Sequence, residues 1–334
     1  MKENKGRIFG YDAIKALAAF FVVLYHVGMV DMGYHDGEYY YPTLVQVLWL
    51  FCACGVPLFF MVNGALTVHR NYDLKKSATK AGRLILAGVF WGVVVMCLYA
   101  AFNHDLSSFK LGMLTYYWFL FSLAIMYMAN YVIGRLPSWC RWIVVGVLLI
   151  FPFLTNLVWD IIILVNPEVT MPQWGHVGAF TLYGLVYLYV GDYLFHRHTN
   201  KLLAIVAAVV GLLLLSMEAT SVVNHTHAQF EGGNYCFPTI GALLLSIAVF
   251  VWLKDWNIKE SLFKKFVVFL GNNALGIYLF HLILLIIVGF LCPQLTDINL
   301  HPITAIIVSL IIMVVSALIS EGMRRLPLSI LLKL

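Results

Sequence analysis

The chain has 334 residues, of which 62% are hydrophobic and only 11% are charged, and its formal net charge is +5. Soluble globular domains carry about 25% charged residues, so this composition excludes an ordinary soluble protein and indicates an integral membrane protein. The apolar runs are long and continuous, which favours membrane-spanning helices over the short alternating strands of a barrel.

Ten stretches of the chain are long and apolar enough to cross a bilayer as helices. The fifth is the least regular, because Pro152 interrupts it and its apolar run continues to Val165. The sequence therefore predicts an all-α polytopic membrane protein of about ten transmembrane helices, with one domain over residues 1–334. In chain order the predicted spans are residues 8–30, 43–67, 80–101, 113–133, 140–159, 177–195, 201–219, 238–254, 266–291 and 303–323.

The basic residues are distributed unevenly between the two sides of this arrangement. With a cytoplasmic N-terminus, the 21 lysine and arginine residues lie in cytoplasmic segments, except Lys15 inside the first helix and Lys110 outside. Cytoplasmic loops of membrane proteins carry an excess of lysine and arginine. The sequence therefore predicts that the N- and C-termini are both cytoplasmic.

The six cysteines do not follow a metal-binding pattern. Cys52 and Cys54 are too close for a zinc loop, and no Cys/His set has zinc spacing. We interpret the cysteines as small apolar residues in packed helices and expect no metal. A disulfide between Cys236 and Cys292 stays an open alternative, since both are predicted to face outside.

The first predicted helix carries three ionisable residues within an apolar run. Lys15 and His26 are eleven residues apart, about 16 Å of helix rise, so they share a face at different depths. Asp12 and Lys15 are three apart and face each other. Such groups are costly in lipid and usually functional, and imidazole serves as a general acid or base. The plainer interpretations are a packing histidine and a paired charge at the membrane boundary.

A basic stripe marks the start of the third helix. Lys76, Lys80 and Arg83 are spaced i, i+4, i+7, and the last two run into the predicted span. Cytoplasmic loops of any membrane protein are enriched in such residues. A stripe that continues into the span also suits a phosphate-bearing ligand.

Further polar residues lie inside the predicted spans. Asn272, Tyr278 and His281 occur at the start of the ninth helix, where Tyr278 and His281 are three apart and share a face. Asn63 precedes Gly64 in the second helix, which indicates either a helix-packing site or a catalytic role. A second histidine near mid-membrane strengthens the functional interpretation of His26.

Taken together, these residues resemble the membrane acyltransferase-3 family, which acylates surface polysaccharides and other glycans. The matching motifs occur in the family's order over nearly the whole chain. They are Asp12-Ala13-Ile14-Lys15, Lys15-x10-His26, Gly55-Val56-Pro57-Leu58-Phe59-Phe60-Met61-Val62-Asn63-Gly64, Lys80-x-x-Arg83, Trp118-Phe119-Leu120 and Gly276-Ile277-Tyr278-Leu279-Phe280-His281. The family has arginine where this chain has Lys15 and Lys80, and usually serine at Asn63. Lysine keeps the charge but lacks the bidentate grip of arginine.

The resemblance implies a membrane O-acyltransferase of the inner cell membrane that uses cytoplasmic acyl-CoA, with acetyl-CoA as the expected donor and a glycan hydroxyl as acceptor. Lys76, Lys80 and Arg83 would hold the donor's phosphates. His26 would act as general base, with Lys15 contacting the donor or steadying Asp12. The candidates for substrate or oxyanion contact are Asn63, Asn272, Tyr278 and His281. Direct transfer and an acyl-histidine intermediate both fit, and no nucleic acid is expected.

Three alternatives stay open at this stage. A secondary transporter with a mid-membrane histidine proton relay fits the helix count, although we find no internal repeat or paired helix breaks. A sensory or partner-binding membrane module would not need Lys15 and His26 on one face. Within the enzyme class, the alternative is that the acyl group is succinyl rather than acetyl.

Overall fold

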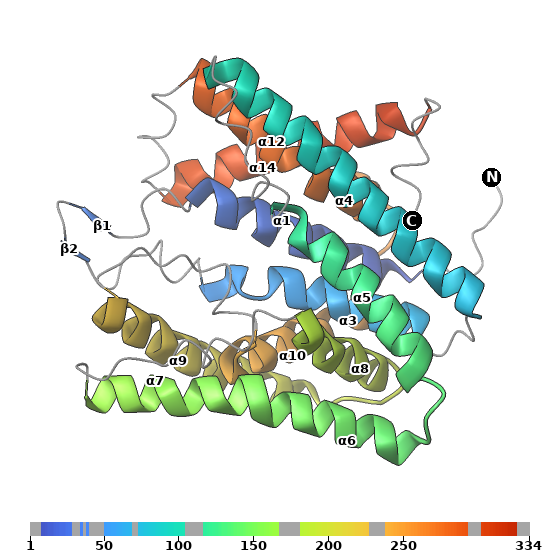
Figure 1. Ribbon diagram of the computed structural model, residues 1–334, viewed down its shortest axis with the longest axis vertical. Coiled ribbons are helices and arrows are strands. Elements are labelled where there is room, and N and C mark those ends of the chain that lie inside the picture. The colour runs from blue at the N-terminus through green and yellow to red at the C-terminus, as the bar shows by residue number, and fades with distance from the viewer. Residues whose placement is uncertain are drawn as a thin grey trace.

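The computed structural model is helical throughout almost all of the chain that it describes (Figure 1). The exception is a short antiparallel pair, β1 (Tyr34–His35) and β2 (Glu38–Tyr39), in which Tyr34 lies opposite Tyr39. Lys110 and Cys236 lie outside the described residues. The structure describes residues 8–28, 34–35, 38–39, 50–68, 73–103, 116–166, 181–226, 238–292 and 302–325.

The helices confirm a multi-pass, all-helical membrane architecture. In the described ranges, seven spans are long and apolar enough to cross a membrane, and α5, α8 and α10 are shorter apolar helices. The count of ten crossings and the cytoplasmic termini stay predictions. The helix bounds are α1 (Phe9–Gly28), α3 (Gly55–Thr67), α4 (Leu74–Asn103), α5 (Trp118–Ile133), α6 (Ser138–Leu148), α7 (Thr155–Val165), α8 (Gly184–Phe195), α9 (Lys201–Thr226), α10 (Ile240–Lys254), α11 (Leu262–Asn272), α12 (Ala274–Leu291) and α14 (Pro302–Met323).

Helix α4 begins at Leu74, earlier than the expected start at residue 80. The reason is the side chain of Asp73, whose Oδ1 accepts a hydrogen bond from the Lys76 backbone N–H at 2.7 Å. Such a side-chain acceptor satisfies an N–H that has no partner within the first helical turn. The whole basic stripe therefore lies on a formed helix rather than partly in a loop.

The irregular fifth segment is one continuous helical span from Ser138 to Val165. Proline removes a backbone donor and collides with the preceding turn of an α-helix. Here α6 and α7 are joined by a π-helical stretch, Leu149–Leu154, which contains Pro152. The widened turn accommodates the proline, so the apolar run does continue to Val165.

The predicted ninth helix, residues 266–291, is divided in the structure into α11 and α12, so its prediction as one helix was wrong. The break lies at Asn273, whose side chain is fully buried. Its Nδ2 donates to the carbonyl of Phe269 at 3.0 Å, and its Oδ1 accepts from Ser320 Oγ at 2.9 Å. Asparagine side chains compete with helical backbone bonding, and α14 supplies the partner that fixes the break.

Helix α1 lies at the centre of the fold and packs against α3, α10, α11, α12 and α14 (Figure 1). Helices α3 and α8 approach closely where each has a glycine. A Cβ atom on Gly64 would overlap the Leu188 carbonyl, and one on Gly191 would overlap the Met61 backbone. Small residues permit such close approach between membrane helices, which confirms the packing role considered for Asn63-Gly64.

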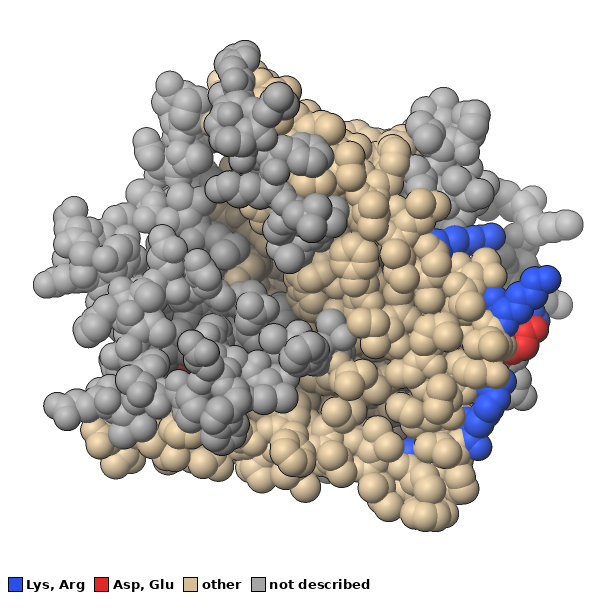
Figure 2. All heavy atoms as spheres, viewed as in Figure 1, with Lys and Arg blue, Asp and Glu red and all other residues tan. Residues whose placement is uncertain are grey.

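Lysine and arginine side chains gather at one end of the molecule in the view of Figure 2, the end where α4 begins and α5 ends in Figure 1. Away from that end, the tan surface in this view shows no lysine or arginine. This one-sided distribution is the pattern that membrane proteins show across a bilayer.

Candidate functional site

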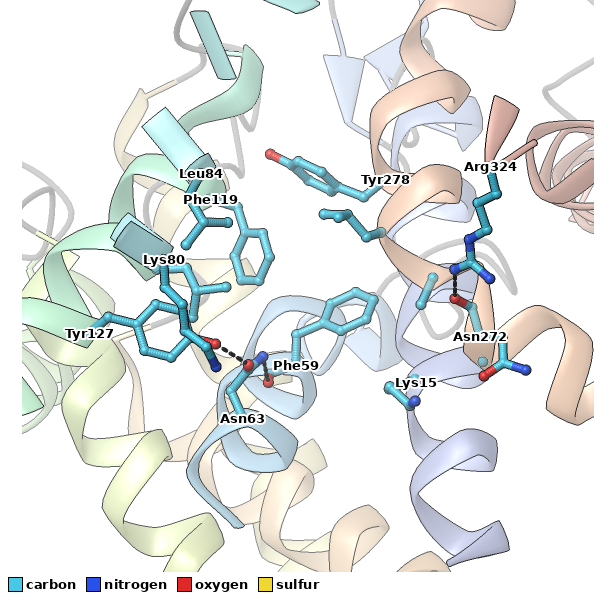
Figure 3. Close-up of a pocket in the computed structure, with 14 residues that line it drawn as sticks. Lys15, Phe59, Asn63, Lys80, Leu84, Phe119, Tyr127, Asn272, Tyr278 and Arg324 are labelled. Atoms are coloured by element: carbon cyan, nitrogen blue, oxygen red, sulfur yellow. Dashed lines mark hydrogen bonds between the residues drawn. The ribbon is translucent and has the colours of Figure 1, made fainter. Parts of the chain in front are cut away.

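A cavity of about 290 Å³ lies near the basic end of the molecule, between α1, α3, α4, α5, α11 and α12 (Figure 3). Its wall combines three cations with aromatic and aliphatic side chains. This is the mixture expected of a small-molecule site. The lining residues are Lys15, Phe59, Asn63, Lys80, Leu84, Phe119, Leu123, Tyr127, Gly271, Asn272, Ala274, Leu275, Tyr278 and Arg324.

One wall of the cavity is a short polar chain between α3, α4 and α5. The half-buried Lys80 places its Nζ 5.1 Å from the centre of the Tyr127 ring. The Tyr127 hydroxyl donates to Asn63 Oδ1 at 3.0 Å, and Asn63 Nδ2 donates to the Phe59 carbonyl at 2.9 Å. Figure 3 shows these side chains side by side. Asn63 thus has a packed, hydrogen-bonded position at the cavity wall.

Lys15, at another part of the cavity wall, forms the predicted pair with Asp12, which is not itself a lining residue. Lys15 Nζ lies 2.9 Å from Asp12 Oδ1, and the exposed fraction is 4% for the Asp12 side chain and 27% for that of Lys15. The expected local pairing is confirmed. A Cβ on Gly271 would lie 2.5 Å from the Asp12 carbonyl oxygen, so glycine allows the end of α11 to contact α1 here.

Arg324, just after α14, is a third cation at the cavity. Its Nη2 donates to the backbone carbonyl of Asn272, and its Nη1 lies 3.5 Å from Glu321 Oε2. Sequence reasoning treated Arg324 only as a topology-setting charge. The i, i+3 spacing to Glu321 was a local signal, but nothing local indicated that Arg324 reaches α11.

The predicted basic stripe contributes one of its three residues to the cavity lining. Lys80 lines the cavity, whereas Lys76 and Arg83 are exposed and are not among the lining residues. An α-helix turns about 100° per residue. The Lys76 side chain therefore points roughly 40°, and the Arg83 side chain roughly 60°, away from that of Lys80, both in the same direction around the helix axis. The stripe therefore spans a wider arc of α4 than the cavity does.

The two intramembrane histidines meet beyond the cavity. The rings of His26 on α1 and His281 on α12 have centroids 5.1 Å apart. His281 is fully buried, and its Nδ1 lies 3.1 Å from the carbonyl oxygen of Ile277. Because a carbonyl only accepts, Nδ1 carries a proton. Nε2 is buried without a hydrogen-bond partner among the described residues. In the neutral ring this atom offers a lone pair.

Tyr278 connects the cavity to the histidine pair. It lines the cavity, and its ring centroid lies 5.9 Å from that of His281, which confirms the predicted shared face. Its hydroxyl donates to the Tyr116 carbonyl at 3.3 Å, so in this conformation its proton is already engaged. Nearby, the Tyr117 hydroxyl donates to the Leu279 carbonyl at 3.0 Å. These bonds hold α12 against the start of α5.

The structure thus brings together residues that the sequence scattered from position 15 to position 281. Lys15, Asn63, Lys80, Asn272 and Tyr278 line one cavity, and His26 and His281 form a pair next to Tyr278. Within the described ranges, no cluster of three His, Cys, Asp or Glu residues is placed to hold a metal ion.

One of the comparisons with known proteins found a match. A family model described as an acyltransferase domain, acyltransferase-3, matches residues 8–321. Neither the curated proteins nor the solved structures gave a match. The family match covers every residue of the cavity and the histidine pair except Arg324. The chain therefore belongs to the acyltransferase-3 family of membrane acyltransferases.

Proposed function

We propose that this acyltransferase moves an acyl group, expected to be acetyl, from cytoplasmic acyl-CoA to a hydroxyl of a surface or lipid-linked glycan. The observation that carries the proposal is the path from a cation-lined cavity, through Tyr278, to the histidine pair. An acyl-CoA donor has phosphates at one end, which would contact the cations, and a thioester carbonyl at the other end, which would lie near the histidines. The protein would then lie in the inner cell membrane.

Donor binding is assigned to the cations at the cavity. Lys80 of α4, Lys15 of α1 and Arg324 just after α14 surround one volume, which favours binding of a phosphorylated molecule. Lys76 and Arg83 lie exposed on the same end of α4, so they would contact parts of the donor outside the cavity. A volume of about 290 Å³ is at the lower end for ligand sites, so it admits the donor's arm rather than the whole molecule.

His26 acts as general base in the proposed transfer. The acceptor oxygen attacks the thioester carbonyl carbon, its proton passes to His26, and the carbon–sulfur bond breaks. The proton then passes from His26 to the departing sulfur, so the products are an ester and free coenzyme A. Asp12 keeps Lys15 in place through the 2.9 Å ion pair. The Asn63 and Asn272 amides are stronger candidates for oxyanion contact than Tyr278, because the Tyr278 hydroxyl donates a hydrogen bond to the Tyr116 carbonyl.

The test is acetyl-CoA turnover by the purified protein in proteoliposomes, with extracted glycan as acceptor. We expect His26→Ala to lower kcat by about 100-fold or more and Lys80→Ala mainly to raise KM for acetyl-CoA. Lys265→Ala is the matched control, since this exposed lysine of α11 does not line the cavity. Normal turnover by His26→Ala would disprove the role of His26. Turnover of succinyl-CoA without turnover of acetyl-CoA would show that the transferred group is succinyl. A substrate-driven proton flux without turnover would favour the transporter.

A further inference from the structure

A second cavity, of about 240 Å³, lies between α6, the end of α8 and the two residues that follow α8. It shares no lining residue with the first cavity. Helices α6 and α8 pack against each other, at the end of the molecule where α5 ends and α6 begins (Figure 1). The lining residues are Ser138, Arg141, Trp142, Val145, Tyr189, Asp192, Tyr193, His196 and Arg197.

Two arginines dominate the charge of this second cavity. Arg141 lies in the first turns of α6, and its Nε is buried without a hydrogen-bond partner in the described part of the chain. Arg197 holds its guanidinium 5.4 Å from the centre of the Tyr193 ring. A buried charged donor that is not hydrogen-bonded is costly. An anion in the cavity would satisfy Arg141 Nε.

The cavity also contains one acidic side chain. Asp192 is 8% exposed, and its Oδ1 lies 3.7 Å from His196 Nε2. Asp192 offsets one of the two arginine charges, so the lining carries a net charge of +1 with His196 neutral. The cavity therefore suits a singly charged anion such as a phosphodiester better than a multiply charged phosphate.

The surface beside the second cavity is apolar and aromatic. Trp142 and Tyr193 pack edge to face with ring centroids 5.5 Å apart, and both are more than 40% exposed. Trp139 and Ile143, on the same helix, are 66% and 55% exposed. Tryptophan and tyrosine are enriched where membrane helices meet the headgroup region. The anion site thus opens beside side chains that suit contact with acyl chains.

We propose that this second cavity binds the phosphodiester of a membrane glycerophospholipid headgroup. Arg141 and Arg197 donate to the phosphate oxygens, the α6 N-terminus at Ser138 adds its backbone dipole, and Trp142 and Tyr193 contact the lipid's upper chain. Basic pockets between membrane helices are a recognised form of headgroup site. This site is independent of the proposed transferase reaction, because it uses other helices and other residues.

Native mass spectrometry of the full-length protein in detergent tests the proposal. The probes are phosphatidylglycerol, diacylglycerol and inorganic phosphate, each titrated alone. We expect one bound phosphatidylglycerol, and no comparable binding of diacylglycerol or inorganic phosphate. Each arginine near a membrane surface contributes about 1 kcal/mol to binding of anionic lipid. Arg141→Ala and Arg197→Ala should therefore each weaken binding about fivefold.

Two controls make the outcome decisive. Arg135→Ala removes an arginine at the same end of the molecule that does not line the cavity, and it should bind the lipid like wild type. Arg197 is exposed, so its alanine variant is expected to fold even if Arg141→Ala does not. Unchanged lipid binding by Arg197→Ala would overturn the proposal. A different result would assign the cavity to free phosphate. In that case inorganic phosphate would bind saturably, and the affinity for phosphatidylglycerol would be the same in all variants.

Discussion

A single backbone carbonyl fixes the chemistry of His281. The Ile277 oxygen accepts a hydrogen bond from His281 Nδ1–H over 3.1 Å, which leaves Nε2 as the only ring atom able to accept a proton in the neutral residue. The His26 ring lies beside it at 5.1 Å. We therefore expect His281 to act as a positioning residue for His26 in the proposed reaction. Its fixed ring limits the orientations that His26 can adopt.

Substitution of His281 separates this positioning role from helix packing. His281→Asn keeps an amide N–H near the Nδ1 position but has no lone pair at the Nε2 position, whereas His281→Ala has neither. We expect both variants to lower kcat by about tenfold or more with little change in KM for acetyl-CoA, because His281 does not line the donor cavity. Steady-state kinetics check this. Near-normal kcat in His281→Asn with loss only in His281→Ala would assign His281 to packing alone.

Sequence spacing correctly predicted contacts between residues that are close together in the chain. Asp12–Lys15 and Tyr278–His281 follow from i, i+3 spacing on a helix, and the structure confirms both. The approach of Arg324 to Asn272 was not predictable, because it depends on how α14 packs against α11. For the same reason, the spacing of Lys76, Lys80 and Arg83 did not reveal which one lines the cavity.

At the scale of elements, the break between α11 and α12 lies in the wall of the first cavity. The cavity is lined on both sides of it, by Gly271 and Asn272 at the end of α11 and by Ala274 at the start of α12. Apolar periodicity predicted where this membrane segment lies. It did not predict the break, since Asn273 needs Ser320 of α14 to stabilise the non-helical turn.

Replacement of Asn273 should destabilise the protein more than replacement of its neighbour. Asn273→Ala leaves the Ser320 hydroxyl, buried at 1% exposure, without its acceptor, which costs about 1–3 kcal/mol. Asn272→Ala is the matched control, because Asn272 is exposed and binds Arg324 through its backbone. Thermal unfolding in detergent measures both. Equal melting temperatures for Asn273→Ala and wild type would contradict the anchoring role.

At the scale of the whole molecule, the one-sided distribution of lysine and arginine predicts the orientation in the membrane (Figure 2). Composition and apolar runs were sufficient to predict an all-helical membrane protein. The convergence of α1, α3, α4, α5, α11 and α12 on one cavity was not predictable, because apolar surfaces that face lipid and those that face other helices have similar sequences.

Thiol labelling of intact cells tests this orientation. Cys292, exposed just after α12, is predicted to face outside, whereas Lys265 on α11 is predicted to face the cytoplasm. In a background with the other cysteines replaced, a membrane-impermeant reagent should modify Cys292. A Lys265→Cys variant lacking Cys292 should react only after the cells are opened. The reverse pattern would place both termini outside.

The aromatic end of the donor cavity also matters to the membrane as an electrical barrier. Besides Lys15, Lys80 and Arg324, the cavity is lined by Phe119 and Tyr278, whose ring centroids are 5.3 Å apart. A hydrated ion would lose its water there, which is costly, and each charge crossing 100 mV dissipates about 2.3 kcal/mol of stored energy. The Tyr278 hydroxyl donates to the Tyr116 carbonyl, and its ring packs against those of Tyr117, Phe119 and His281. Moving the ring aside would cost these contacts as well as the hydrogen bond, so an ion that had shed its water would also have to open this part of the cavity wall.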